Sequence, residues 1–165
     1  MATPTQRVTE RFRQLLMGES GLAQSIAALR DRPESVLRAQ SAERVGSAQA
    51  SAEIQEKSGV NEYPVFQVYV AKIENTMREK FRSFSGTIHL VTEVRVSGDR
   101  LEGLTEELHF YADAVADVIE RSRGDLGDGI ILSGAYETVF EPAKKGGLHY
   151  QQTARVTCEA GLSRH

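Results

Sequence analysis

Hydrophobic spacing between residues 63 and 124 changes from strand-like to helical. Residues 63–73 carry apolar side chains at both parities, as in a strand covered on both faces. Residues 86–98 alternate apolar and polar positions, as in a half-buried antiparallel strand. Residues 101–123 place their large apolar side chains on one helical face, and Gly124 is suited to end that helix. The apolar positions of this face are Leu101, Leu104, Leu108, Tyr111, Val115, Val118 and Ile119.

Two further strand patterns follow, at residues 130–140 and 148–161. They flank residues 142–147, a turn-like segment with one proline, two lysines and two glycines. The second strand alternates over its whole length, and only Gln152 interrupts its apolar positions. Those positions are Leu148, Tyr150, Ala154, Val156, Cys158 and Ala160. The pattern predicts a long hairpin in which Cys158 is a buried core residue rather than a nucleophile.

The N-terminal third of the chain has a weaker pattern. Residues 5–17 and 20–32 predict two helices with narrow apolar stripes, which we expect on a surface or against a neighbour. Residues 34–62 contain no aromatic residue and few large apolar ones. We interpret them as a mobile linker or an arm that orders on a partner, with a solvated loop or loose helix as an equally weighted alternative.

These patterns together predict an α+β protein. Its core is a mostly antiparallel four-stranded sheet in the order β-β-α-β-β, with the long helix packed across one face. The expected organisation is N-terminal helices over 1–33, a linker or arm over 34–62, and the α+β core with its C-terminal hairpin over 63–165.

Composition narrows the possible functions. The chain has 165 residues, 26% of them charged, and a net charge of −3. This balance argues against a dedicated nucleic-acid-binding surface, which normally shows a basic excess. No apolar run approaches the ~20 residues of a membrane helix, and the first residues lack the apolar core of a signal peptide. A single cysteine excludes an internal disulfide and favours a reducing compartment.

Motifs for catalysis or metal binding are missing from the sequence. There is no HxxxH, CxxC or GxSxG pattern, and the segment 124–129 is interpreted as a turn rather than a calcium loop. Asp113 and Asp117 are expected to be solvated residues on the outer face of the long helix. A metal site built by the fold from His89 and His149 is the minor alternative. We therefore predict no enzymatic activity, no metal and no cofactor.

The hairpin, following a long amphipathic helix and a two-strand unit, resembles the tail-terminator proteins in the necks of long-tailed bacteriophages. The similar positions are 136–140, the break at Pro142, 144–147, and the strand with Gln152, Ala154 and Val156. The resemblance covers residues 63–165. It implies a non-enzymatic virion protein, made in the host cytoplasm, that forms a hexameric ring. Such a ring caps the tail tube, contacts the head connector and lets DNA pass without specific binding.

On this interpretation the hairpin supplies subunit or tail contacts. The candidate contact residues are Lys144, Lys145, Gly146, Gly147 and Tyr150. Four strand carboxylates are candidates for a ring lumen, with ordinary solvated positions as the equal alternative: Glu93, Glu137, Glu141 and Glu159.

Two alternatives remain open at the level of the sequence. One is a head-closure or connector protein of the same neck. The other is a small α+β enzyme or ligand-binding domain whose site is assembled from scattered residues such as His89, Tyr111 and His149.

Overall fold

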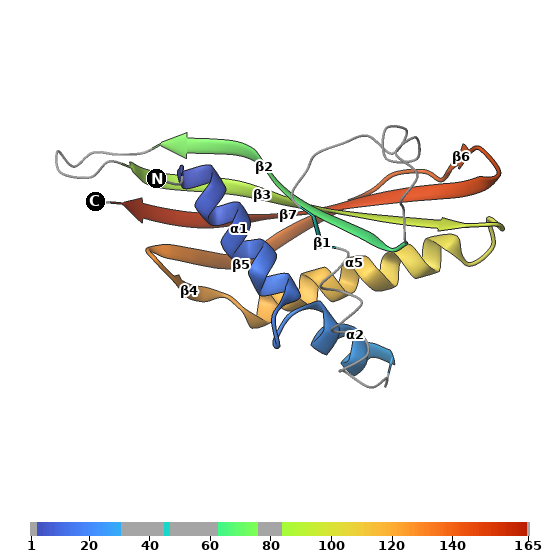
Figure 1. The fold of residues 1–165 in the computed structure, drawn as a ribbon, viewed down its shortest axis with the longest axis horizontal. Coiled ribbons are helices and arrows are strands. Elements are labelled where there is room, and N and C mark those ends of the chain that lie inside the picture. Colours follow the sequence, from blue (N-terminus) through green and yellow to red (C-terminus); the bar gives the residue numbers. More distant parts are fainter. Residues whose placement is uncertain (1–2, 31–44, 47–62, 76–83, 165) are drawn as a thin grey trace.

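The computed structural model describes residues 3–30, 45–46, 63–75 and 84–164, which form three helices and seven strands (Figure 1). The helices are α1 (Pro4–Met17), α2 (Leu22–Arg30) and α5 (Leu104–Arg121). The longer strands are β2 (Val65–Asn75), β3 (Phe84–Gly98), β5 (Ile130–Phe140) and β7 (His149–Arg164). The shorter strands are β1 (Val45–Gly46), β4 (Gly124–Gly127) and β6 (Lys144–Gly146).

All seven strands belong to one sheet, in the order β1-β2-β3-β7-β5-β4, with β6 also paired to β7. Every pairing is antiparallel except that of β1 with β2. β3 pairs with β7 over all of its 15 residues. The predicted four-stranded sheet is therefore too small. The four predicted strands are present, but β1, β4 and β6 have only two to four residues and are too short to show an alternating pattern.

Two predicted turns contain short strands. Gly124–Gly127 forms β4, so the turn into β5 is reduced to Asp128 and Gly129. Lys144–Gly146 forms β6, so the turn into β7 consists of Gly147 and Leu148. Leu148 was expected on the apolar side of the last strand, but it lies in this turn and is 91% exposed.

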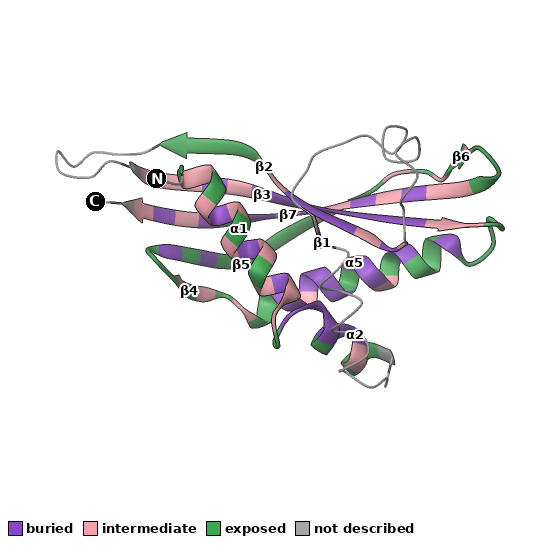
Figure 2. Cartoon of the chain, viewed as in Figure 1, coloured by how far each residue is buried: buried purple, intermediate pink, exposed green. Residues whose placement is uncertain are grey.

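The helices cover one face of the sheet and enclose the core against it (Figure 1). α5 lies against β3, β5 and β7, and α1 lies against β1, β2 and β3. On β7 the predicted alternation is confirmed between Ala154 and Ala160, because every second residue there is buried (Figure 2). These residues are Ala154, Val156, Cys158 and Ala160. The apolar face of the sheet is thus buried beneath the helices, and its other face carries most of the polar strand residues.

α1 packs into the core of the subunit itself, whereas the first helices were expected on a surface or against a neighbour. Val8, Phe12 and Leu16 are fully or almost fully buried. One narrow stripe suffices because it meets the apolar side chains of β2, including Phe66. The helix begins at a capping box, in which Thr3 Oγ1 accepts from the Gln6 backbone N–H and the Gln6 side chain accepts from the Thr3 N–H.

Arginines hold α1 to distant strands. Arg11 Nε donates to the Leu126 carbonyl at 2.9 Å, and Arg13 Nε donates to the Val45 carbonyl at 2.8 Å. Val45 is buried and pairs with Phe66. Val45–Gly46 is the part of the expected 34–62 arm that the structure describes, and the remainder of that expectation lies outside the described residues.

α5 is shorter than its apolar stripe predicted. It begins at Leu104 because Gly103 adopts a left-handed conformation with φ +78°, and Leu101 is consequently 54% exposed. Near its end, Asp117 accepts hydrogen bonds from the buried Ser25 hydroxyl at 2.7 Å and from Arg121 Nε at 2.9 Å. Asp117 was expected to be solvated, but it joins α5 to α2.

Candidate functional site

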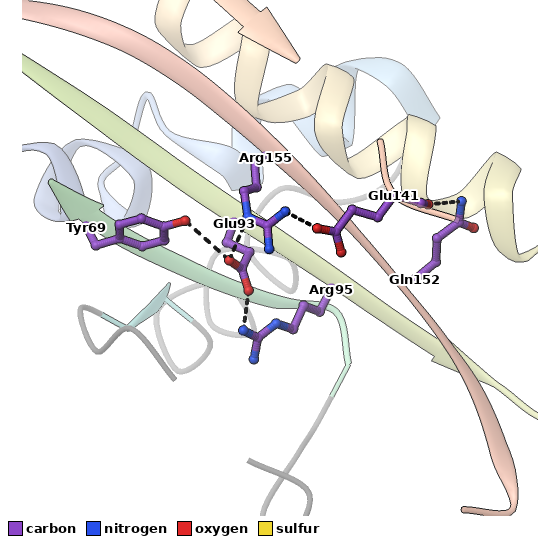
Figure 3. Close-up of polar contacts among 6 residues, drawn as sticks. All are labelled: Tyr69, Glu93, Arg95, Glu141, Gln152 and Arg155. Carbon is purple, nitrogen blue, oxygen red and sulfur yellow. Dashed lines mark hydrogen bonds and ion pairs between the residues drawn. The ribbon is translucent and has the colours of Figure 1, made fainter. Parts of the chain in front are cut away.

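A charged cluster occupies the sheet face opposite the helices. Strand register brings it together, because Glu93 of β3 lies opposite Arg155 of β7 and opposite Gln67 of β2. Directly opposite residues in an antiparallel pair project from the same face. Arg95 lies two residues along β3, and Tyr69 lies two residues along β2 from Gln67, so both project toward Glu93 (Figure 3).

Glu93 is the centre of this cluster. Its Oε2 accepts from Arg155 Nε at 3.2 Å and from the Tyr69 hydroxyl at 3.4 Å, and its Oε1 forms an ion pair with Arg95 Nη2. The side chains of Glu93 and Arg95 are only 5% and 7% exposed. An unpaired charge at this depth would be strongly unfavourable, so the pairing is required for the fold.

Arg155 connects Glu93 to the segment after β5. Its Nη1 forms an ion pair with Glu141, and this hydrogen bond raises the pKa of the Arg155 guanidinium above its ordinary value, with Glu93 adding to the effect. Burial raises the pKa of Tyr69, and the charge of Glu93 raises it further. The arginine therefore stays charged and the tyrosine stays a hydrogen-bond donor.

A polar pocket of about 190 Å³ lies beside the cluster. It brings together three of the residues predicted from sequence, namely Glu93, Glu141 and Lys144. Its wall includes Gln152, which accepts from the Thr105 hydroxyl at 2.9 Å and donates to the Glu141 carbonyl at 3.0 Å. Gln152 therefore interrupts the apolar positions of β7 because its amide joins α5 to the segment that leads into β6.

The structure gives the four candidate lumen carboxylates different environments. Glu93 is buried, which contradicts both a lumen-facing and a solvated position for it. Glu141 is partly buried and paired with Arg155. Glu137 is exposed on β5. Glu159 is also exposed, and its Oε1 lies 3.5 Å from His89 Nδ1.

The candidate contact residues lie at the end of β7 that is remote from Glu159. Lys144 and Lys145 are exposed on β6, opposite Gln151 and the half-buried Tyr150. Gly147 has a φ of +63° in the turn itself. Sequence reasoning missed Tyr69, Arg95 and Arg155, and the only available signal was that Arg155 and Glu93 share the polar parity of their strands.

His89 and His149 lie far apart and do not form a common site. His89 lies beside Glu159, whereas His149 Nδ1 lies 2.6 Å from Asp99 Oδ1 near the other end of β7. Ten residues of extended strand separate the two ends by about 33 Å, so the alternative metal site from His89 and His149 is wrong. Tyr111 packs on Phe66 on the helix-covered side, so the alternative triad of His89, Tyr111 and His149 is not assembled either. Among the described residues, no group of three metal-ligating side chains is close enough to hold a metal ion.

Most of the charged groups that line the pocket are paired with one another. The pocket offers the cations Arg95, Arg155 and Lys144 and the carboxylates Glu93 and Glu141. The thiol of Cys158 is buried on the opposite, helix-covered side, and burial raises its pKa to about 12. A thiol in this state is a poor nucleophile.

No family model matches the chain, and no curated protein matches its sequence. Within the described part of the chain, no helix is long and apolar enough to span a membrane. Among solved structures, the protein is similar to a chain from the "virion of native gene transfer agent (GTA) particle". The sequence identity is 14% and the TM-score is 0.38, over 85% of this chain and 94% of that chain. A similarity of this size defines neither a family nor a role.

Proposed function

We propose that this protein is a structural protein of a phage-like virion, forming a ring in the neck that terminates the tail tube and joins the tail to the head. The resemblance of residues 63–165 to tail-terminator proteins implies this place in a phage neck. The observation that carries the proposal is the β6–β7 hairpin. It ends the long β3–β7 ladder (Figure 1), and Leu148 in its turn is almost fully exposed.

The chemistry of the hairpin supports a contact role. Leu148 is 91% exposed in the turn, and Lys144 and Lys145 are exposed on β6, just before that turn. A hairpin end with one apolar side chain and two cations is suited to a partner surface that offers an apolar depression and carboxylates. The hairpin is also well anchored, because Gln152 and Arg155 bind the segment before β6.

The proposed ring places the sheet face opposite the helices toward the DNA. Glu159 is exposed on that face, and its carboxylate repels phosphates without binding them. Glu93 and Glu141 do not contribute in this way, because arginines neutralise them.

The test is a hairpin variant with Lys144→Glu, Lys145→Glu and Leu148→Ser. All three side chains are exposed, so the urea midpoint of the subunit should not change. We expect loss of ring formation or of attachment to tail tubes, measured by light scattering and negative-stain imaging. The matched control is Leu101→Ser, which removes an exposed leucine from the nearby β3–α5 loop and should assemble normally.

The outcomes separate the possible roles. Normal attachment of the hairpin variant would overturn the contact role of the hairpin. A wild-type chain that remains monomeric with tail tubes present would overturn the ring. A ring that attaches to heads but not to tails would assign the protein to head closure.

A further inference from the structure

Among the described residues, no strand pairs with the outer edges of β5 and β2 over stretches of similar length. On the outer side of β5, the described strand β4 pairs only with residues near Ile130–Leu132, which leaves 133–140 without a neighbour among the described residues. On the outer side of β2, the described strand β1 pairs only with Phe66 and Gln67. Residues 71–75 of β2 are all exposed, as is most of β5 (Figure 2).

These edges carry apolar side chains. Tyr136, Val139 and Phe140 of β5 are 40–52% exposed, and Ile73 of β2 is 41% exposed. An open edge with exposed apolar residues is a template for pairing with another strand, and soluble proteins normally cover such edges.

We propose that β5 of one copy pairs antiparallel with β2 of the next copy, continuing the sheet from subunit to subunit. This inference deepens the proposed function and rests on its ring. Strand directions follow from the topology. β2 and β7 run one way while β3 and β5 run the other, because each neighbouring pair is antiparallel. A rotation about an axis roughly along the strands preserves these directions, so β5 meets β2 in the antiparallel sense.

One register satisfies two side-chain pairs at once. When Ile73 lies opposite Tyr136, Lys72 lies opposite Glu137. Ile73 and Tyr136 both project from the helix-covered face, because they share register rows with Ile88 and Cys158.

Lys72 and Glu137 both project from the other face, since Lys72 lies opposite His89 and Glu137 lies opposite Thr157. The register therefore joins an apolar pair on one face and an opposite-charge pair on the other. The Lys72 side chain is 62% exposed and already contacts Glu74 at 2.5 Å, so Glu137 would give this cation a second carboxylate.

The same register requires a stagger between subunits. Ile73 pairs with Ile88, and Ile88 pairs with Ala160, so Ile73 and Ala160 lie at the same height along the strands. Tyr136 pairs with Cys158 and therefore lies at the height of Cys158. The offset is two residues, about 7 Å along the strand. A sheet that closes on itself needs tilted strands and a staggered register, so the offset is compatible with ring closure.

Cysteine crosslinking tests the pairing directly. In a Cys158→Ala background, the double variant Ile73→Cys/Tyr136→Cys should form intermolecular disulfides on mild oxidation. A head-to-tail interface should give a ladder of linked products, and its longest member reports the number of subunits. Each single variant should remain unlinked. The control pair Val70→Cys/Tyr136→Cys represents the register without stagger and should link at least tenfold more slowly.

Charge exchange provides a second readout. Lys72→Glu places a carboxylate opposite Glu137 and should raise the concentration needed for assembly by about three- to tenfold. Adding Glu137→Lys should restore assembly to within about threefold of the wild type.

Several results would overturn the inference. Crosslinking of Tyr136→Cys alone would indicate a symmetric β5–β5 dimer. Intact rings without a 73–136 crosslink would reject this interface but leave the proposed function standing. A wild-type chain that stays monomeric would remove both.

Discussion

Replacing Glu93 with glutamine should strongly destabilise the subunit. Glutamine preserves the shape of the side chain and one acceptor oxygen but removes the negative charge. Arg95, whose side chain is 7% exposed, then loses its ion pair with the Glu93 carboxylate. Arg155 keeps Glu141 and is 37% exposed, so water screens much of its loss.

The expected magnitude follows from these exposures. Removing one partner of a buried ion pair costs about 3–5 kcal/mol. The lower end applies here because the amide retains an acceptor and Arg155 retains a partner, which gives about 3 kcal/mol. For a chain of this size, this loss corresponds to a Tm about 6–12 °C lower.

Urea unfolding followed by circular dichroism measures the effect. With an m-value of about 2 kcal/mol/M, the midpoint should fall by about 1.5 M without a change in slope. Glu159→Gln is the matched control, because that side chain is 56% exposed and its removal should change stability by less than about 0.5 kcal/mol. A Glu93→Gln variant within 1 kcal/mol of the wild type would refute the assignment of a buried, structurally required charge.

Three further predictions concern local features. Cys158, with its pKa of about 12, should react with a bulky thiol reagent far more slowly in the native protein than in urea. The unfolded thiol ionises near pH 9 and the native thiol near pH 12, so the contribution of the neutral thiol to stability is complete below pH 9 and decreases as the pH rises toward 12. The urea midpoint of Cys158→Ala should not show this decrease. Thr3→Ala should cost about 1 kcal/mol by removing the cap of α1, whereas Thr9→Ala within that helix should cost less, both by urea unfolding. Gly129→Ala should cost about 3 kcal/mol of stability, since φ is +77° and the added Cβ would lie 2.4 Å from the Ser163 carbonyl oxygen. Gly147→Ala should cost only about 1 kcal/mol, because φ is +63° but the added Cβ would meet no neighbouring side chain or strand within 4 Å. Equal urea midpoints for the two variants would contradict the steric argument.

Long alternating strands and the long helix could be predicted from sequence because each buries its side chains at a regular period. The buried positions between Ala154 and Ala160 follow directly from the alternation. β1 could not be predicted, because it consists of one buried valine and one glycine with no period to detect. β6 was hidden in the same way by a lysine- and glycine-rich sequence that is typical of turns.

The charged cluster shows a different limit. Glu93, Arg95 and Arg155 alternate with apolar residues as solvated strand residues do. Alternation identifies the face of a strand but not whether that face is buried. The contact that pairs Glu93 with Arg155 joins residues 62 apart in sequence, so no local pattern reveals it. Leu148 is the converse, since its parity predicted burial but the turn places it in solvent.

The position of β7 also constrains the order in which the protein can fold. Among the described strands it is a central strand of the sheet, and it is the last to leave the ribosome. β7 is one of the two described neighbours of both β3 and β5, and the ends of β3 at Phe84 and Gly98 pair with Arg164 and Tyr150 of β7. Such non-local contacts form late and slowly. A chain truncated before His149 leaves β3 and β5 without the strand between them, so an interrupted translation product cannot complete the sheet, and incomplete copies are kept out of any assembly that requires the finished subunit.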